Sequence, residues 1–164
     1  MALLNDLAMK MIEYYKNDPG NIDHLIKVHA YAKLIAEEEH IDKELLLIVE
    51  STAYLHDIGI KNALAKYNSA IGELQEKEGP DEARKILIEL GYEDTIIERI
   101  CYIIGHHHTY DAIDNIDFQI VVEANLIANY YEEKLPKENI LYSYDKVFKT
   151  ETGKLIMENI YNLY

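Results

Sequence analysis

The sequence predicts an all-α protein, a single helical bundle, on two observations. Apolar residues recur at helical spacing along most of the 164 residues, and no segment of useful length alternates as a strand does. Hydrophobic residues make up 49% and charged residues 28% of the chain, the ordinary balance of a globular protein with a buried core. No repeat or low-complexity tract divides the chain, so we expect one domain over residues 1–164.

The expected helices are separated by short turns. They cover about Ala2 to Asn17, Ile22 to Glu39, Asp42 to Gly59, Pro80 to Gly91, Asp94 to His107, Asp117 to Glu133 and Ser143 to Leu163. Asp42 can cap the third helix, whose run of apolar residues at 45–49 covers nearly every side and predicts a central, buried helix. Pro80 suits the start and Gly91 the end of the fourth helix. The stretch 61–78 is less regular, and Gly153 interrupts the last helix.

Charge and composition exclude several classes of partner and location. A formal net charge of -14 repels phosphate backbones and anionic membranes, so we expect neither duplex nucleic acid nor membrane binding. The single Cys101 cannot form an internal disulfide, and the amphipathic start does not resemble a signal peptide. No apolar run approaches the roughly 18 residues that span a bilayer. These observations predict a cytoplasmic protein.

Side chains that bind metals are spread over several expected helices. They are His24, the adjacent pair His56 and Asp57, Glu78, the run His106, His107 and His108, and Asn125. A divalent cation prefers imidazole and carboxylate ligands that converge from separate elements. Because neighbouring residues on a helix diverge by about 100°, His56 and Asp57 can share an ion only where their helix ends, and Gly59 allows such an end. The alternative is that His56 is a satisfied core histidine and Asp57 caps the next turn.

The segment 24–28, which begins with His24, and the later LHDIG at 55–59 resemble the HD-domain (His-Asp) metal-dependent phosphohydrolase superfamily. The resemblance covers a metal-site core at about 21–131 and leaves a C-terminal helix at about 143–163 outside it. It implies an HD-type helical bundle with His24, His56 and Asp57 as metal ligands, completed by a carboxylate from a late helix. His29 is the rival for the first ligand, and we interpret it as a core or surface histidine.

The resemblance also implies that Glu78 is a ligand of a second metal ion. The step Glu78-Gly79-Pro80 is similar to a His-Gly-Pro-like step of the family, with Glu in place of His. Glutamate can coordinate a hard cation or act as a general base on water. The alternative is that Glu78 belongs to the acidic surface around Glu73 and Glu76.

The three consecutive histidines leave two registers open. The family has an Ile-x-x-His-His step here, so Ile103 selects His106 and His107, whereas Ile104 selects His107 and His108. His107 is common to both, and we expect His106 and His107 to be the pair. The loop that follows, at 110–115, can cover the site.

Asn125 departs from the family pattern, which has an Asp in a Glu-Ala-Asp-like step. An amide offers only a neutral carbonyl oxygen and cannot act as a base. Glu123 lies two residues away and faces another side of the helix, whereas Asn129 is one turn on and can share the face of Asn125.

The resemblance implies a metal-dependent phosphohydrolase that acts on a nucleotide or another small phosphate ester through metal-activated water. Asp57 and Glu78 would be its catalytic residues, and one or two divalent ions (Mn, Fe, Co, Ni, Zn or Mg) its cofactor. Lys61 can contact phosphate, although an exposed lysine is the more ordinary interpretation. Two alternatives remain: a degenerate HD module that binds a nucleotide or a partner without catalysis, which Asn125 favours, and a di-iron oxygenase.

Overall fold

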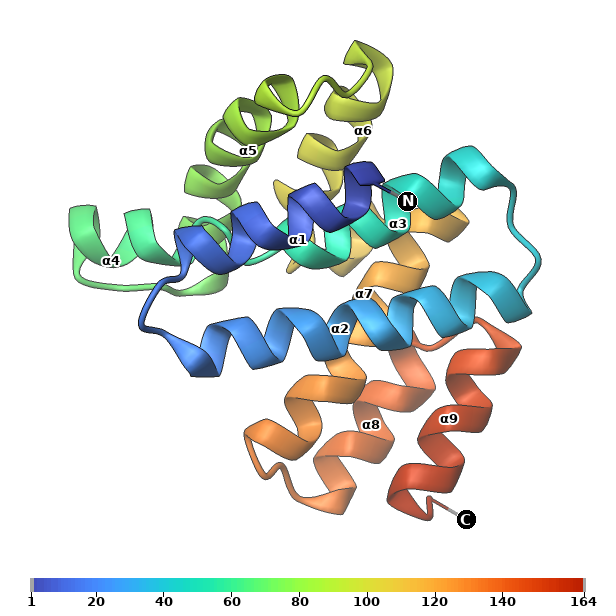
Figure 1. Ribbon diagram of the computed structural model, residues 1–164. Helices are drawn as coiled ribbons and strands as arrows, with labels where there is room; N and C mark the ends of the chain where they lie inside the picture. The colour runs from blue at the N-terminus through green and yellow to red at the C-terminus, as the bar shows by residue number, and fades with distance from the viewer. Residues whose placement is uncertain (1, 164) are drawn as a thin grey trace.

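The computed structural model describes residues 2–163, which form an all-helical bundle without a strand (Figure 1). The elements are α1 (Ala2–Tyr14), α2 (Pro19–Glu38), α3 (Lys43–Leu55), α4 (Ile60–Tyr67), α5 (Gly72–Glu89), α6 (Asp94–Ile104), the 3-10 turn η1 (Tyr110–Ala112), α7 (Ile116–Glu132), α8 (Lys137–Val147) and α9 (Glu151–Tyr161). The prediction of an all-α fold is confirmed.

The core forms where α2, α3 and α7 pack against one another, with α1 and α6 on the outer sides of α3. In Figure 1, α1 and α2 run across the front, α5 and α6 lie above them, and α8 and α9 lie below. The second half of α3, residues 48–55, is buried, whereas Leu45, Leu46 and Leu47 of the predicted apolar run are only half-buried. Residues 117–128 of α7 are also buried, so polar side chains on these two helices face the interior.

Local signals set the starts of α2 and α3. The Asp42 carboxylate accepts a hydrogen bond of 2.9 Å from the amide of Leu45, which confirms Asp42 as the cap of α3. Asp18 caps α2 in the same way, and Pro19 occupies the first turn. The second helix therefore begins at Pro19, three residues before the predicted Ile22, because proline is well tolerated at a first helical position.

The prediction that Pro80 opens a helix is wrong. The irregular stretch before it forms α4 and the first half of α5, and Pro80 lies inside α5. The expected end is right: Gly91 has a φ of 79°, a left-handed conformation that glycine adopts without strain, directly after the last turn of α5. As a result, Glu78 lies in the middle of a helix and not at its start.

The C-terminal interruption is also displaced from its predicted position. The break between α8 and α9 falls at residues 148–150, and Gly153 lies inside α9. The buried Glu123 explains this glycine, because a Cβ at position 153 would lie only 2.1 Å from a Glu123 carboxylate oxygen. That carboxylate accepts hydrogen bonds from the amides of Lys149 and Thr150 at the start of α9.

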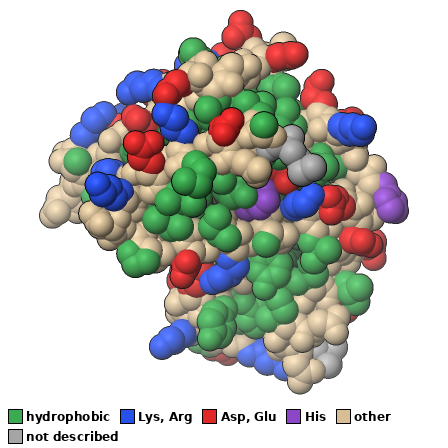
Figure 2. All heavy atoms as spheres, viewed as in Figure 1, with side chains coloured by type: hydrophobic (Ala, Val, Ile, Leu, Met, Phe, Trp, Pro, Cys, Tyr) green, Lys and Arg blue, Asp and Glu red, His purple; other side chains and the backbone are tan. Residues whose placement is uncertain are grey.

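The surface carries charges of both signs. On the face shown in Figure 2, acidic and basic side chains are interspersed with apolar ones, and no single-sign patch dominates. Within residues 2–163, no helix combines the length and the apolar character needed to cross a bilayer.

The close approach of α5 to the end of α3 yields a test of packing. In Gly59→Ala, the new Cβ would lie 2.4 Å from the carbonyl oxygen of Gln75 and 2.7 Å from the amide nitrogen of Gly79, both backbone atoms. We expect a loss of about 3 kcal/mol in the free energy of unfolding, measured by urea denaturation. Gly20→Ala is the control, since its nearest neighbour would be Asp18 Oδ1 at 3.8 Å. Equal stability of the two variants would contradict this account.

Candidate metal centre

Three histidines converge on the carboxylate of Asp57 from three parts of the fold. His24 comes from α2, His56 and Asp57 from the end of α3, and His107 from the turn after α6. One oxygen of Asp57 lies 3.2 Å from Nε2 of His24 and 3.5 Å from Nε2 of His56. The other oxygen lies 3.4 Å from Nε2 of His107. All four side chains are buried, with His56 fully excluded from solvent.

The second ring nitrogen of each histidine is held by an oxygen acceptor. Nδ1 of His24 lies 2.7 Å from the Glu132 carboxylate. Nδ1 of His56 lies 2.9 Å from the carbonyl of Ala53, and Nδ1 of His107 lies 2.7 Å from the carbonyl of Ile104. An oxygen acceptor favours a proton on Nδ1, so in the neutral ring the lone pair of each Nε2 faces the centre. Metal-ligating histidines are oriented by outer partners in this manner.

The donor atoms fit a divalent ion. Nε2 of His107 is buried and has no hydrogen-bond partner among residues 2–163, a costly state for an isolated nitrogen. Nε2 of His24 and Nε2 of His56 are 3.3 Å apart, close to the separation of about 3 Å expected for two ligands bound at roughly 2.1 Å to one ion. Two donor groups share Asp57: one with His24 and His56, the other with His107 and His108. These buried groups can therefore hold a metal ion.

The backbone at the end of α3 explains how adjacent residues reach the same centre. The helix ends at Leu55, and His56 and Asp57 lie in the turn that follows. The Tyr15 hydroxyl donates a 2.5 Å hydrogen bond to the carbonyl of Asp57 and so ties α1 to this turn. The expectation that His56 and Asp57 converge at a helix end agrees with this geometry.

The electrostatics of the centre keep Asp57 ionised and His56 neutral. Burial would raise the pKa of Asp57, but the surrounding imidazoles outweigh burial and hold this pKa well below its usual range. Burial lowers the pKa of His56 to about 4, so its imidazole is neutral at pH 7. Burial also acts to lower the pKa of His24, but hydrogen bonds and charge from Asp57 and Glu132 raise it overall.

His106 does not join the centre. Its Nδ1 lies 2.7 Å from the carbonyl of Tyr102, and its ring packs against the Tyr102 ring. His107 and His108 are instead the neighbours of Asp57, so the register set by Ile104 describes the structure. The reason is that α6 ends at Ile104, and the turn after it carries His106 away from the core.

Glu78 does not reach the centre either. It faces α4, where its carboxylate accepts hydrogen bonds of 2.5 Å from Lys66 and 2.8 Å from Tyr67. These hydrogen bonds lower the pKa of Glu78, which makes it a weaker base. The mid-helix position of Glu78 in α5 accounts for this direction. Two residues that precede Glu78 in α5, Gln75 and Glu76, contact His108 instead.

Asn125 lies where the sequence places the last ligand. It is buried, and it lines the same cavity as His24 and Asp57. Asn129 shares its face and donates a 3.2 Å hydrogen bond to the Asn125 carbonyl oxygen. Glu123 points to α9 instead, as its position in the helix predicts.

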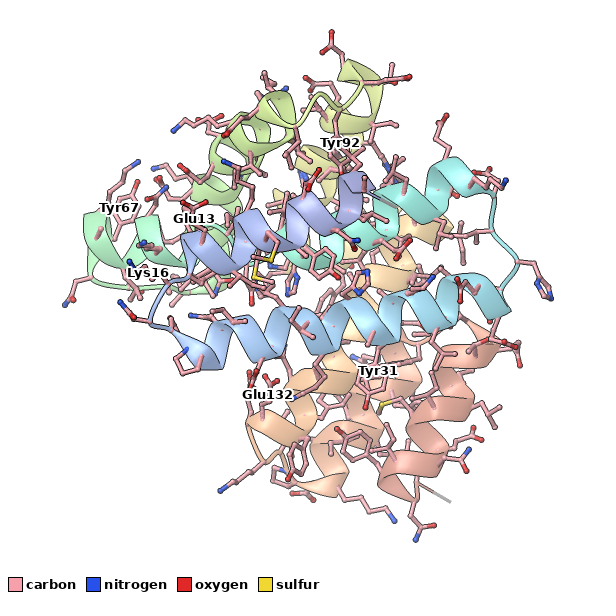
Figure 3. The ribbon with its side chains drawn as sticks, in the orientation of Figure 1. Glu13, Lys16, Tyr31, Tyr67, Tyr92 and Glu132 are labelled. Carbon is pink, nitrogen blue, oxygen red and sulfur yellow. The ribbon has the colours of Figure 1, made fainter. Side chains whose placement is uncertain are left out.

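Several residues around the centre are missing from the sequence interpretation. Glu132, which is labelled in Figure 3, holds His24 and also accepts a 2.7 Å hydrogen bond from Lys27, one turn along α2. Its position seven residues after Asn125 places it on the same face of α7, a signal that was available in the sequence. Asn21 and Gln75 also line the cavity, which measures about 270 Å³, but nothing in their local sequence indicates it.

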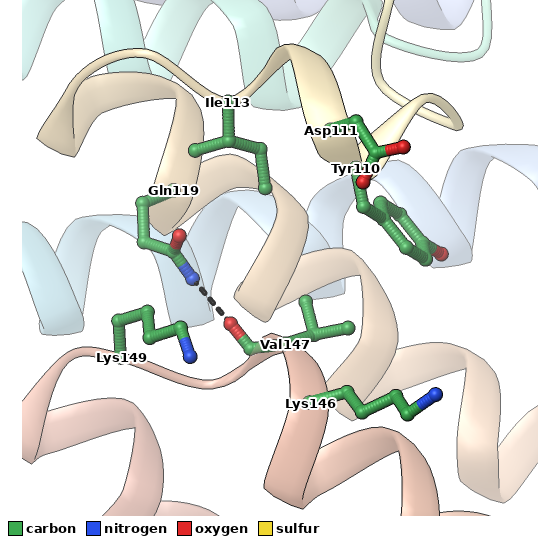
Figure 4. A pocket seen from close by; sticks show the side chains of 7 residues that line it. All are labelled: Tyr110, Asp111, Ile113, Gln119, Lys146, Val147 and Lys149. Atoms are coloured by element: carbon green, nitrogen blue, oxygen red, sulfur yellow. Dashed lines mark hydrogen bonds between the residues drawn. The ribbon is translucent and has the colours of Figure 1, made fainter.

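A larger cavity of about 590 Å³ lies elsewhere, between η1 and the segment joining α8 to α9 (Figure 4). Tyr110 and Asp111 line one side of it, and Lys146 and Lys149 the other. None of the converging histidines lines this cavity. Tyr110 therefore faces this cavity and is absent from the lining of the one at the histidines.

Comparison with known proteins identifies the fold. The chain is similar to the crystal structure of a predicted HD superfamily hydrolase from an uncultured Thermotogales bacterium, with a TM-score of 0.68 over 98% of this chain and 84% of that one. The chain has the HD-domain fold. Sequence identity to that HD structure is 22%, so the likeness concerns the fold alone. A scan against protein-family models and a search of curated proteins found no match.

Within this HD-domain fold, two histidines of α2 provide a matched test of the metal centre. In His24→Gln we expect the affinity for Mn²⁺ or Zn²⁺ to fall by more than about 100-fold, because an inner donor is lost. In His29→Gln we expect it to stay unchanged, since His29 stacks on Tyr54 and pairs with Glu50. Competition with a chromogenic chelator measures both affinities. Equal losses in the two variants would place the ion elsewhere.

The lowered histidine pKa values predict a pH dependence of the metal-free protein. Burial lowers the pKa of His56 and of His108 to about 4, against 6.5 for an ordinary histidine. Between these values the unfolded chain takes up protons that the folded chain does not, so stability falls as pH falls. The raised pKa of His24 opposes this trend. The stability that His24 contributes is fully present below pH 6.5 and is lost as the pH rises through the pKa of His24 in the folded state.

We expect the free energy of unfolding to fall by a net amount on the order of 2 kcal/mol from pH 7 to pH 5, measured in the presence of a chelator. Urea unfolding at the two pH values measures this loss. His108→Gln should show a smaller loss, since one of the two lowered groups is gone. The same loss in both proteins would show that His108 titrates normally in the folded state.

Proposed function

We propose that this chain is a metal-dependent phosphohydrolase that acts on a nucleotide or another small phosphate ester. The observation that carries the proposal is the convergence of buried histidine nitrogens on Asp57, with Nε2 of His107 left without a hydrogen-bond partner among the described residues. The HD-domain fold adds support, because the similar crystal structure is of a predicted HD superfamily hydrolase.

The residues that would hold the metal are His24, His56 and Asp57 on one side, and His107 and His108 on the other. When bound, a divalent ion polarises phosphoryl oxygens and lowers the pKa of a water molecule. Asp57 faces both groups of donors through separate oxygens, a position that suits a bridging carboxylate. One or two ions are compatible with this arrangement.

The cavity beside the centre also favours metal dependence. The groups that line it are amides and carboxylates as well as histidines, and none of its lining residues is Lys or Arg. These lining residues therefore supply no permanent cation to balance a phosphate group, and a divalent ion would provide that charge. Amides of Asn21, Asn125 and Asn129 can hydrogen-bond a phosphate ester and orient it.

The reaction would be hydrolysis of a phosphate ester. Water adds to phosphorus, the bond between phosphorus and the ester oxygen breaks, and the departing oxygen receives a proton to leave an alcohol and inorganic phosphate. Asp57 remains ionised and would accept hydrogen bonds or bind the cation throughout. Glu78 is not assigned as the base, since Lys66 and Tyr67 hold its carboxylate.

Asn125 favours a second candidate, an HD-type module that binds a small phosphorylated ligand without hydrolysing it. Its amide lines the cavity at the position where the resemblance implies a carboxylate. An amide is a weaker metal ligand than a carboxylate and removes one negative charge from the centre. Activity measurements on two variants separate this candidate from the hydrolase.

We expect the protein to release inorganic phosphate from small phosphate esters with Mn²⁺, Co²⁺, Ni²⁺ or Zn²⁺ added after chelation. Asp57→Asn should lower kcat by about 100-fold or more, since the shared carboxylate is lost. Asp111→Asn, which changes the same charge at the distant cavity, should not. No phosphate release by the natural chain, together with strong release by Asn125→Asp, would instead support the binding module.

A further inference from the structure

A second cavity, distinct from the one beside η1, adjoins the cavity at the metal centre. It lies between the turn from α1 to α2 and the helix α4, and its walls include Tyr14, Lys61 and Leu64. Asn21 and Ile60 line both cavities, so the two share a rim at these residues. A molecule bound at the metal centre can therefore extend past Ile60 into the second cavity.

The second cavity has the size and the walls for one aromatic ring. Its volume is about 210 Å³. A dry protein cavity of about 150 Å³ holds benzene, so one substituted ring fits here. Ile60, Leu64 and Tyr14 provide apolar surface, and Leu64 is 50% exposed. Covering this surface would favour binding.

The charge of this cavity is opposite to that of the chain as a whole. Lys16, which is labelled in Figure 3, and Lys61 line it. Neither lysine forms an ion pair with a carboxylate among residues 2–163. The one acidic group of the lining, Asp18, is engaged at the start of α2, where it accepts hydrogen bonds from the backbone and side chain of Asn21. In a protein with a net charge of -14, two lysines facing one small cavity mark a place for an anion.

We propose that the substrate is an aromatic phosphate monoester whose single ring occupies this cavity and whose distal anionic group, such as a carboxylate, binds Lys16 and Lys61. This proposal rests on the proposed phosphohydrolase function, which it deepens by naming the substrate class. The phosphate end lies in the cavity of the histidines, where the lining offers no lysine or arginine. The distal end lies where the chain does offer cations. The two ends of the substrate are thus recognised by different chemistry.

The contacts of Lys61 define the competing explanation. Its Nζ donates a 3.1 Å hydrogen bond to the carbonyl of Tyr14 and lies 4.9 Å from the centre of the Tyr14 ring. In this competing explanation, the only role of Lys61 is to stabilise the packing of α4 against α1. Such a role predicts an effect of substitution on stability and none on the choice between substrates.

The test compares phenyl phosphate with 4-carboxyphenyl phosphate, which differ only in the distal carboxylate. In the double variant Lys16→Gln/Lys61→Gln, we expect the ratio of kcat/KM for the carboxylated probe to that for phenyl phosphate to fall about tenfold, through KM. The control is Lys43→Gln/Lys137→Gln, which removes the same charge at the first residues of α3 and α8. An unchanged ratio in the first variant, with or without a lower Tm, would overturn the proposal.

Equilibrium binding separates a failure of this proposal from a failure of the hydrolase assignment. If the metal-loaded protein hydrolyses neither probe, calorimetry measures the Kd of each probe for the natural chain and for both double variants. A preference for the carboxylated probe that is lost only in Lys16→Gln/Lys61→Gln would uphold the subsite and refute the hydrolase. The absence of that preference in the natural chain would refute the subsite.

Discussion

The structure depends on one buried charge, the carboxylate of Asp57 at the end of α3. An ionised carboxylate in the interior is costly unless partners of opposite character surround it. Three imidazoles surround this carboxylate and lower its pKa, and each ring is oriented by an oxygen acceptor on its far nitrogen. The arrangement of α2, α3 and the turn after α6 can be understood as the means of bringing these rings to one carboxylate.

The packing around this turn follows from the same requirement. Tyr15 fixes the backbone of Asp57 from α1. On the other side, Gly59 and Gly79 lack side chains, which allows the backbone of α5 to lie directly against the turn. The turn is therefore held from two sides by elements distant in sequence, which suits a centre whose ligands must keep a fixed geometry. The same contact leaves Glu78 pointing toward α4, away from the histidines.

The sequence predicts the parts of this protein that local chemistry decides. Helical periodicity indicates the all-α fold, and the cap at Asp42 and the stop at Gly91 follow from the preferences of single residues. The order of His24, His56 and Asp57 could also be anticipated. The direction of Glu78 could not, because each residue turns a helical side chain by about 100° and the start of α5 was misplaced.

The remaining site residues show a second limit of prediction from sequence. The turn after α6 decides between His106 and His108, and a turn of this kind has no periodicity to follow. Asn21 and Gln75 reach the cavity only through the packing of α2, α4 and α5. Glu132, by contrast, lies on the same face of α7 as Asn125 and could have been found by its spacing. Sequence patterns thus identify faces of helices more readily than they identify turns.

The support of His24 by Glu132 gives the buried centre a connection to the ionic strength of the solvent. The Glu132 side chain is 30% exposed and is shared between His24, which is 9% exposed, and Lys27 at the surface. Dissolved salt weakens the exposed pair with Lys27 far more than it weakens the contact with the buried ring. Salt thereby loosens Lys27 from the carboxylate whose other oxygen holds His24. The carboxylate that orients a buried imidazole is therefore itself exposed to the electrolyte outside the protein.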